Sequence, residues 1–280
     1  MKFVAALAVS LSILAAAPAP AQDAGWRTVA PENLLVIDTP KGRIVVELDP
    51  RVAPLHVERI RTLADQGFYD GLKFHRVIAG FMAQTGDPEG TGQGGSPLPD
   101  VPAEFQFRRG RDAGFFQVET SATVQLGVMG SLPVVTQPDA QMMATRDMKA
   151  GAQALFCPGV AGMARSGNNI NSANSQFFLM TGANEALNGG YTAFGRVLSG
   201  MDVVVALNAG PEEDNGRVVN PDVMTRVRTA SAMPAAQRPA ARVMEPSAPA
   251  FAEVVAAART ARGTEFSICD VQPPAQITGG

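Results

Sequence analysis

Short apolar segments separated by turns containing glycine or proline run through most of the chain, and they constrain its fold more than any other feature. Residues 34–37 and 43–48 flank a Thr-Pro-Lys-Gly turn, which predicts a β-hairpin. Further short strands are predicted at 72–78, 80–84, 159–164, 175–180, 191–197 and 223–228. Helices are predicted at 54–66, where proline stands in the first turn, and at 201–207. Many short strands with two helices predict a mostly β fold, an antiparallel barrel capped at its ends.

The first residues predict export. Met1-Lys2 precedes an apolar run over residues 3–17, and Ala19-Pro20-Ala21 supplies the small residues that a signal peptidase accepts. Residues 1–21 are therefore expected to be a cleavable signal peptide, and no later segment is long enough to cross a bilayer. We expect a periplasmic location, with secretion as the alternative.

The chain has two cysteines, Cys157 and Cys269, so only one intramolecular pairing exists. An even count in an exported chain favours a disulfide, which would tie the C-terminal part of the chain to its middle. Two buried free thiols are the alternative.

Composition excludes several function classes. A formal net charge of −3 gives no general attraction to nucleic acid. Two cysteines and two histidines do not form a zinc-binding pattern, and no other cofactor is implied. Residues 90–95 match Gly-x-Gly-x-x-Gly, but the prolines at 97, 99 and 102 forbid the helix that a dinucleotide site needs, so a flexible loop is expected.

Two segments near the middle of the chain carry the strongest functional signal. Alternation in the first, residues 74–87, would place Phe74, Arg76 and Ile78 on one core-facing side, where an arginine is costly unless its charge is needed. Alternation in the second places Gln176 and Phe178 together with Met180. Taken alone, the first segment could contain an arginine paired with a buried carboxylate. The second, taken alone, could contain two aromatic residues of the core.

Together the segments closely resemble the cyclophilin family of peptidyl-prolyl isomerases. Residues 74–87, FHRVIAGFMAQTGD, are a nearly complete copy of the family signature, and NSQFFLM at 174–180 and FGRV at 194–197 follow in the expected order. The resemblance covers about residues 32–230. It implies an eight-stranded antiparallel barrel with a helix over each end, and catalysis of rotation about X–Pro bonds in proline-containing peptides and unfolded envelope proteins.

The resemblance also implies roles for particular residues. Arg76 would donate a hydrogen bond to the twisted amide nitrogen, with Gln84 holding the substrate backbone and Arg76, and with His75 and Phe81 beside them. The remaining binding residues expected at the pocket are Ile78, Met82, Ala164, Gln176, Phe178, Leu187 and Tyr191. His56 is expected to be a solvated surface residue.

The chain departs from the family at several points. Ala186 stands where many members carry a tryptophan that contacts cyclosporin, which predicts weak binding of that drug. Arg165 stands where asparagine is usual and adds a charge at the peptide groove. An insertion occupies about residues 108–157, with strand-like segments at 115–119 and 123–128 and a helix-like segment at 141–153. Residues 231–280 form a C-terminal extension with a short helix predicted at 250–261.

Two functions from different classes remain open. The first is an exported prolyl isomerase that assists protein folding in the cell envelope. The alternative is a non-catalytic module or chaperone that holds proline-containing segments. The presence of Arg76 favours the enzyme, because binding alone does not need a donor aimed at the amide nitrogen.

Overall fold

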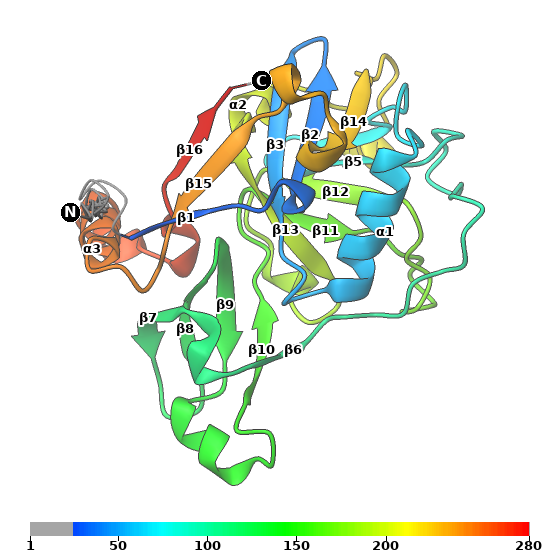
Figure 1. The fold of residues 1–280 in the computed structure, drawn as a ribbon. Coiled ribbons are helices and arrows are strands. Elements are labelled where there is room, and N and C mark those ends of the chain that lie inside the picture. Colours follow the sequence, from blue (N-terminus) through cyan, green and yellow to red (C-terminus); the bar gives the residue numbers. More distant parts are fainter. Residues whose placement is uncertain (1–24, 280) are drawn as a thin grey trace, which may run out of the picture.

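The computed structural model describes residues 25–279, and the predicted signal peptide lies outside them. Eight strands form one antiparallel sheet in the order β14-β2-β3-β13-β11-β12-β5-β4 (Figure 1). Bridges from Lys73 to Val223 and from Arg76 to Arg217 join the segments beside the two outer strands, so the curled sheet closes. The strands are β2 (Leu34–Thr39), β3 (Gly42–Leu48), β4 (Arg76–Ile78), β5 (Met82–Thr85), β11 (Val160–Met163), β12 (Phe177–Met180), β13 (Ala193–Ser199) and β14 (Arg226–Thr229).

The barrel interior holds one apolar cluster to which two helices, α1 (Pro54–Asp65) and α2 (Met201–Val205), contribute. Alternation along the strands supplies its side chains. Phe177 and Phe194, for example, meet edge to face with ring centroids 6.1 Å apart. The predicted eight-stranded barrel with two helices is confirmed.

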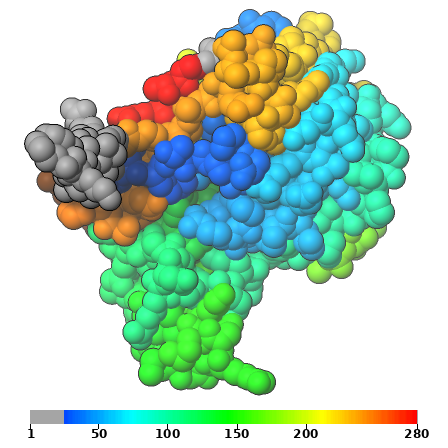
Figure 2. All heavy atoms as spheres, viewed as in Figure 1, coloured from blue at the N-terminus to red at the C-terminus, as the bar shows by residue number. Residues whose placement is uncertain are grey.

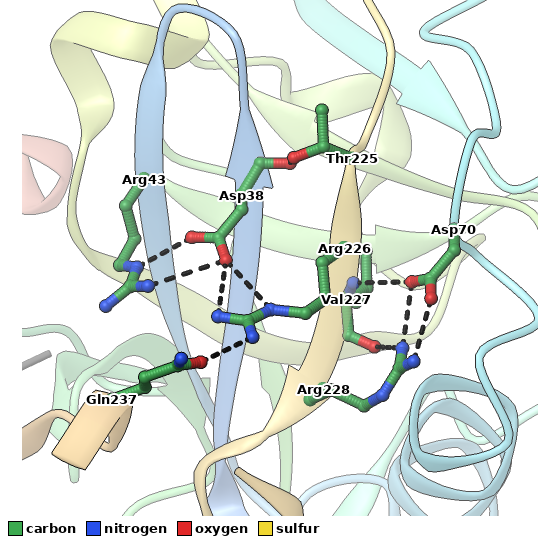
Figure 3. Close-up of polar contacts among 8 residues, drawn as sticks. All are labelled: Asp38, Arg43, Asp70, Thr225, Arg226, Val227, Arg228 and Gln237. Carbon is green, nitrogen blue, oxygen red and sulfur yellow. Dashed lines mark hydrogen bonds and ion pairs between the residues drawn. The ribbon is translucent and has the colours of Figure 1, made fainter. Parts of the chain in front are cut away.

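Acidic side chains fasten the outer strand β14 to its neighbours. Figure 3 shows Asp38 of β2 between Arg43 and Arg226, with an ion pair of 2.7 Å to the Arg43 Nε. Asp70 accepts hydrogen bonds from the Val227 N–H and from the Arg228 guanidinium, both at 2.8 Å (Figure 3). The Asp38–Arg226 contact joins β14 to β2, and Asp70 joins β14 to the segment after α1.

The insertion folds as its own five-stranded antiparallel sheet, in the order β6-β10-β9-β8-β7. Its strands are β6 (Phe107–Arg109), β7 (Phe115–Thr120), β8 (Gln125–Met129), β9 (Leu132–Thr136) and β10 (Ala150–Ala154). In Figure 2 it projects from the barrel as a separate green lobe.

The C-terminal residues pair with the beginning of the described chain. β15 (Ala240–Met244) lies between β1 (Trp26–Thr28) and β16 (Ala275–Thr278) in a three-stranded antiparallel sheet. Helix α3 (Phe251–Arg262) packs on the insertion, where Phe251 meets Phe116 of β7 at 5.2 Å between ring centroids. A disulfide joins Cys157, at the exit of the insertion, to Cys269.

Three sequence predictions are wrong. Phe74 is in the barrel interior while Arg76 is half-exposed on the outer side, because regular pairing begins only at Arg76 and the alternation does not extend back to Phe74. The helix predicted at 141–153 is a 3₁₀ turn (Asp139–Ala144) followed by β10, because pairing with β6 and β9 overrides local helix propensity. His56 is fully buried against Glu104, and not on the surface.

Candidate active site

A row of polar side chains crosses the outer face of β4, β5 and β12. The strand register places Arg76 opposite Gln84 and Gln84 opposite Phe178. Arg76 Nη1 donates to Gln84 Oε1 at 3.1 Å, and Gln84 Nε2 donates to Gln176 Oε1 at 2.9 Å. Gln176 in turn donates to the backbone carbonyl of Gly94 at 2.8 Å. Each side chain therefore orients the next, and the row ends on fixed backbone.

A loop on the other side holds the rest of the Arg76 guanidinium. Its Nε donates to the backbone oxygen of Asn215 and its Nη2 to the Asn215 side-chain oxygen, both at 2.9 Å. Asn215 adopts a left-handed conformation, φ 54°, which asparagine tolerates better than most residues. Burial lowers the pKa of Arg76 from its ordinary value, yet a guanidinium remains a cation at neutral pH. Asn215 was not identified from the sequence, although Asn-Gly is a recognised turn signal.

A cavity of about 170 Å³ opens beside Arg76. Phe178 forms part of its wall and packs between Phe156 and Tyr191, at centroid distances of 5.7 and 5.9 Å. The cavity brings together these residues predicted from the sequence: Arg76, Phe81, Met82, Gln84, Ala164, Phe178, Leu187 and Tyr191. Its lining combines the guanidinium groups of Arg76 and Arg165 with a majority of apolar and aromatic side chains, which suits a small apolar ring joined to a polar backbone.

Three other predicted residues lie next to this cavity without lining it. Gln176 lines a larger neighbouring cavity of about 640 Å³, and His75 lines one of about 300 Å³ that also contains Arg76. Ile78 lines none of these three cavities and packs in the cluster beneath them. The His75 ring is buried, and this burial lowers its pKa despite the opposing influence of the Asp87 carboxylate.

The glycine-containing loop at 90–95 lies beside this region, and the side chain of Asp87 accepts hydrogen bonds from its backbone. The buried Asp87 carboxylate accepts backbone N–H groups from Glu89, Thr91 and Gly92 at 2.8, 2.9 and 2.5 Å. Burial alone would raise the pKa of Asp87, but these hydrogen bonds lower it, so the carboxylate stays charged. The loop therefore presents the Gly94 carbonyl to Gln176 in a fixed position.

Comparison with known proteins then decides the family. A model for the family described as "Cyclophilin type peptidyl-prolyl cis-trans isomerase/CLD" matches residues 34–229. The chain belongs to the cyclophilin family. As a cyclophilin it is a peptidyl-prolyl cis-trans isomerase, which confirms the family, the fold and the enzyme class that the sequence predicted.

Individual relatives of this cyclophilin agree. It is 38% identical over 229 residues to a probable peptidyl-prolyl cis-trans isomerase of Brucella suis, covering 78% of this chain and 89% of the relative. It is 32% identical over 195 residues to a peptidyl-prolyl cis-trans isomerase-like protein of Aspergillus oryzae, covering 69% and 93%.

The crystal structure of a cyclophilin from Hirschia baltica superposes with a TM-score of 0.83 at 32% identity, covering 93% of this chain and 96% of the other. That overlap extends well beyond residues 34–229, so the similarity includes residues outside the family match. Within residues 25–279, each helix is too short or too polar to span a membrane.

Proposed function

We propose that this cyclophilin is exported and isomerises X–Pro bonds of unfolded proteins in the cell envelope, with Arg76 as the residue that lowers the barrier. Rotation about an amide costs about 18–20 kcal/mol because the C–N bond has partial double-bond character. In the twisted transition state the nitrogen lone pair is localised and can accept a hydrogen bond. A donor aimed at that nitrogen stabilises the transition state more than the planar ground state.

The observation that carries the assignment is the fixed guanidinium of Arg76 at the rim of a mainly apolar cavity. Gln84 and Asn215 hold it from two sides, so the donor needs little reorganisation during rotation. The proline ring would enter the cavity between Met82 and Phe178, and its entry would expel water and strengthen the contact with Arg76. Gln84 would then bind the substrate backbone.

The test is NMR exchange spectroscopy on an Ala-Pro-containing peptide with the mature protein and the Arg76→Ala variant. We expect strong acceleration that falls about 100- to 1,000-fold in the variant, the loss typical of a missing transition-state donor, while peptide binding persists. Arg146→Ala, which removes an exposed arginine of the insertion, is the matched control and should keep full activity. Peptide binding without acceleration by the unmutated protein would replace the enzyme with the binding module.

The disulfide supports the proposed envelope location, because that compartment is oxidising. Cys157 and Cys269 are paired, and disulfides persist mainly outside the cytosol. The apolar leader over residues 3–17 agrees, although it lies outside the described residues. Cell fractionation with N-terminal sequencing tests this proposal. A mature N-terminus near Gln22 in the periplasmic or secreted fraction supports it, and an uncleaved chain in the cytosol contradicts it.

A further inference from the structure

Arg165 occupies the boundary between two cavities of the groove. It follows β11 and lines both the cavity of about 170 Å³ beside Arg76 and the larger one of about 640 Å³. Gln84 and Ala164 are the other residues common to both linings. A peptide with its proline in the smaller cavity would therefore run past Arg165 as it continues toward the larger one.

The guanidinium of Arg165 is held by neutral groups. Its Nε donates to the Gly190 carbonyl at 2.8 Å and its Nη1 to the Ser166 carbonyl at 2.9 Å. The guanidinium carbon lies 4.6 Å from the ring centroid of Tyr191 and 5.8 Å from that of Phe105. Both distances are within cation–π range, so the side chain is positioned without a neutralising partner.

The charge around Arg165 is correspondingly unbalanced. Within residues 25–279, no carboxylate lies at ion-pair distance from its guanidinium. The smaller cavity is lined by two cations, Arg76 and Arg165, and by no acidic residue. The acidic residue in the lining of the larger cavity is Asp100, which accepts a hydrogen bond from Asn174 at 3.0 Å. The smaller cavity, where the proline would sit, is therefore positive in a chain whose net charge is −3.

We propose that Arg165 is a specificity-determining residue that favours X–Pro peptides carrying an acidic side chain close to the proline. This inference rests on the proposed function and names the class of substrate. A guanidinium offers a planar pair of donors that matches a carboxylate, whereas a lysine or a neutral amide at this position would not. Because the carboxylate contact forms both before and during rotation, it changes KM more than kcat.

The experiment compares matched peptides that differ only by Glu or Gln at one position, placed in turn at the two residues before the proline and the residue after it. NMR exchange gives kcat/KM for each peptide with the unmutated protein, Arg165→Gln, Arg165→Lys and the charge-matched control Arg146→Gln. For at least one position we expect a Glu/Gln ratio of about five to ten at low salt, decreasing as salt is added. The ratio should fall to about one in Arg165→Gln, remain partly in Arg165→Lys and stay unchanged in Arg146→Gln.

The Glu/Gln ratio of kcat/KM is insensitive to a general loss of activity, because both peptides are measured with the same variant. A ratio of about one at every position in the unmutated protein overturns the inference, and so does a preference that persists in Arg165→Gln. Failure to accelerate any of the Gln peptides is a different outcome, which contradicts the proposed isomerase. In that case the affinities of the same peptides, measured by titration, still decide whether Arg165 selects acidic segments.

Discussion

At the scale of single residues, the orientation of the Arg76 guanidinium depends on an asparagine that is distant in the sequence. Asn215 receives two of its hydrogen bonds, and the next residue, Gly216, allows the close approach. A Cβ at Gly216 would lie 2.3 Å from the Ile78 side chain, and its φ is 73°. The loop can therefore reach Arg76 only with a residue tolerant of left-handed backbone followed by glycine.

Two substitutions of Asn215 distinguish the effect of its side-chain hydrogen bond from the effect of its left-handed backbone conformation. Asn215→Gly removes the side-chain acceptor while keeping the left-handed conformation accessible, and Asn215→Asp keeps an acceptor. We expect kcat to fall about tenfold in Asn215→Gly, with KM little changed, because the loosened guanidinium contributes less in the transition state. Asn215→Asp should stay close to the unmutated protein. Equal kcat values for the glycine variant and the unmutated protein would show that the Asn215 side chain is not needed, and that Gln84 and the Asn215 backbone oxygen suffice to position Arg76.

The face of a strand on which a residue lies could be predicted from the sequence better than the contacts between distant segments. Alternation placed Gln176 and Phe178 on one face correctly, because strand periodicity is a local property. Asn215 and His56 were missed or misplaced because their partners, Arg76 and Glu104, are distant in the chain. Only the folded barrel brings such residues together.

At the scale of elements, Glu104 joins the beginning of α1 to the beginning of the insertion. Its carboxylate accepts the N–H groups of Leu55 and His56, both at 3.1 Å, and lies 2.7 Å from the His56 Nδ1. A carboxylate at a helix N-terminus satisfies unpaired N–H groups and interacts favourably with the helix dipole. The next residue, Phe105, lies near Arg165, so the same contact also supports the groove.

Glu104 should give the protein a pH-dependent stability. Burial by itself would raise the pKa of Glu104, but the hydrogen bonds from the His56 ring and from backbone N–H groups lower it below the ordinary value. A carboxyl whose pKa is lowered on folding contributes stability above its unfolded pKa, and that contribution is lost as pH falls through the folded pKa. In Glu104→Gln we expect the free energy of unfolding to fall by about 1–2 kcal/mol at pH 7, the scale of a helix cap.

Denaturant unfolding at pH 7 and pH 4 checks this expectation. The difference between the unmutated protein and Glu104→Gln should be largest at pH 7 and become smaller toward acid. Glu58→Gln makes the same charge change on an exposed position of α1 and should change little at either pH. A difference that is constant across this range would mean that the Glu104 charge makes no contribution to folding.

At the scale of the whole molecule, the barrel is covered on its outside as well as filled on its inside. Along β2, Leu35 and Ile37 face the interior cluster, while Leu34 and Val36 face a second cluster formed with the three-stranded sheet. The continuous apolar run at 34–37 is the sequence signal for a strand buried on both faces. It did not identify the C-terminal extension as the cover, because a one-dimensional pattern does not name the partner.

Buried Arg196 of β13 connects the barrel to both added parts. Its guanidinium donates to the carbonyl of Ser131 in the insertion at 3.4 Å and to that of Pro273 in the extension at 3.2 Å. A third bond, 2.9 Å long, reaches the Gln272 side chain. Burial lowers the pKa of Arg196 to about 10, which reflects the cost of removing the charge from water, and the three hydrogen bonds offset part of that cost. Barrel, insertion and extension are thus joined by a polar centre as well as by the disulfide.

This arrangement predicts that the barrel needs its extension for solubility. A chain ending at Ala230, with Cys157→Ser to avoid a free thiol, would expose Val36 and Val45, which are 1% and 2% exposed in the full chain. We expect it to aggregate, because apolar strand surface is left uncovered. Adding Val36→Thr and Val45→Thr should restore part of its solubility, since threonine keeps strand propensity and tolerates water.

The same two threonines should have the opposite effect in the full-length protein. There they bury hydroxyl groups beneath the three-stranded sheet, and we expect the free energy of unfolding to fall by about 2 kcal/mol or more. Sedimentation of the truncated chains and denaturant unfolding of the full-length chains measure the two effects. If the valine-containing truncated chain is soluble and unfolds cooperatively, the extension is an accessory to the barrel. If the two threonines improve the truncated chain but destabilise the full-length chain, the outer face of β2 and β3 is part of the core of the whole molecule.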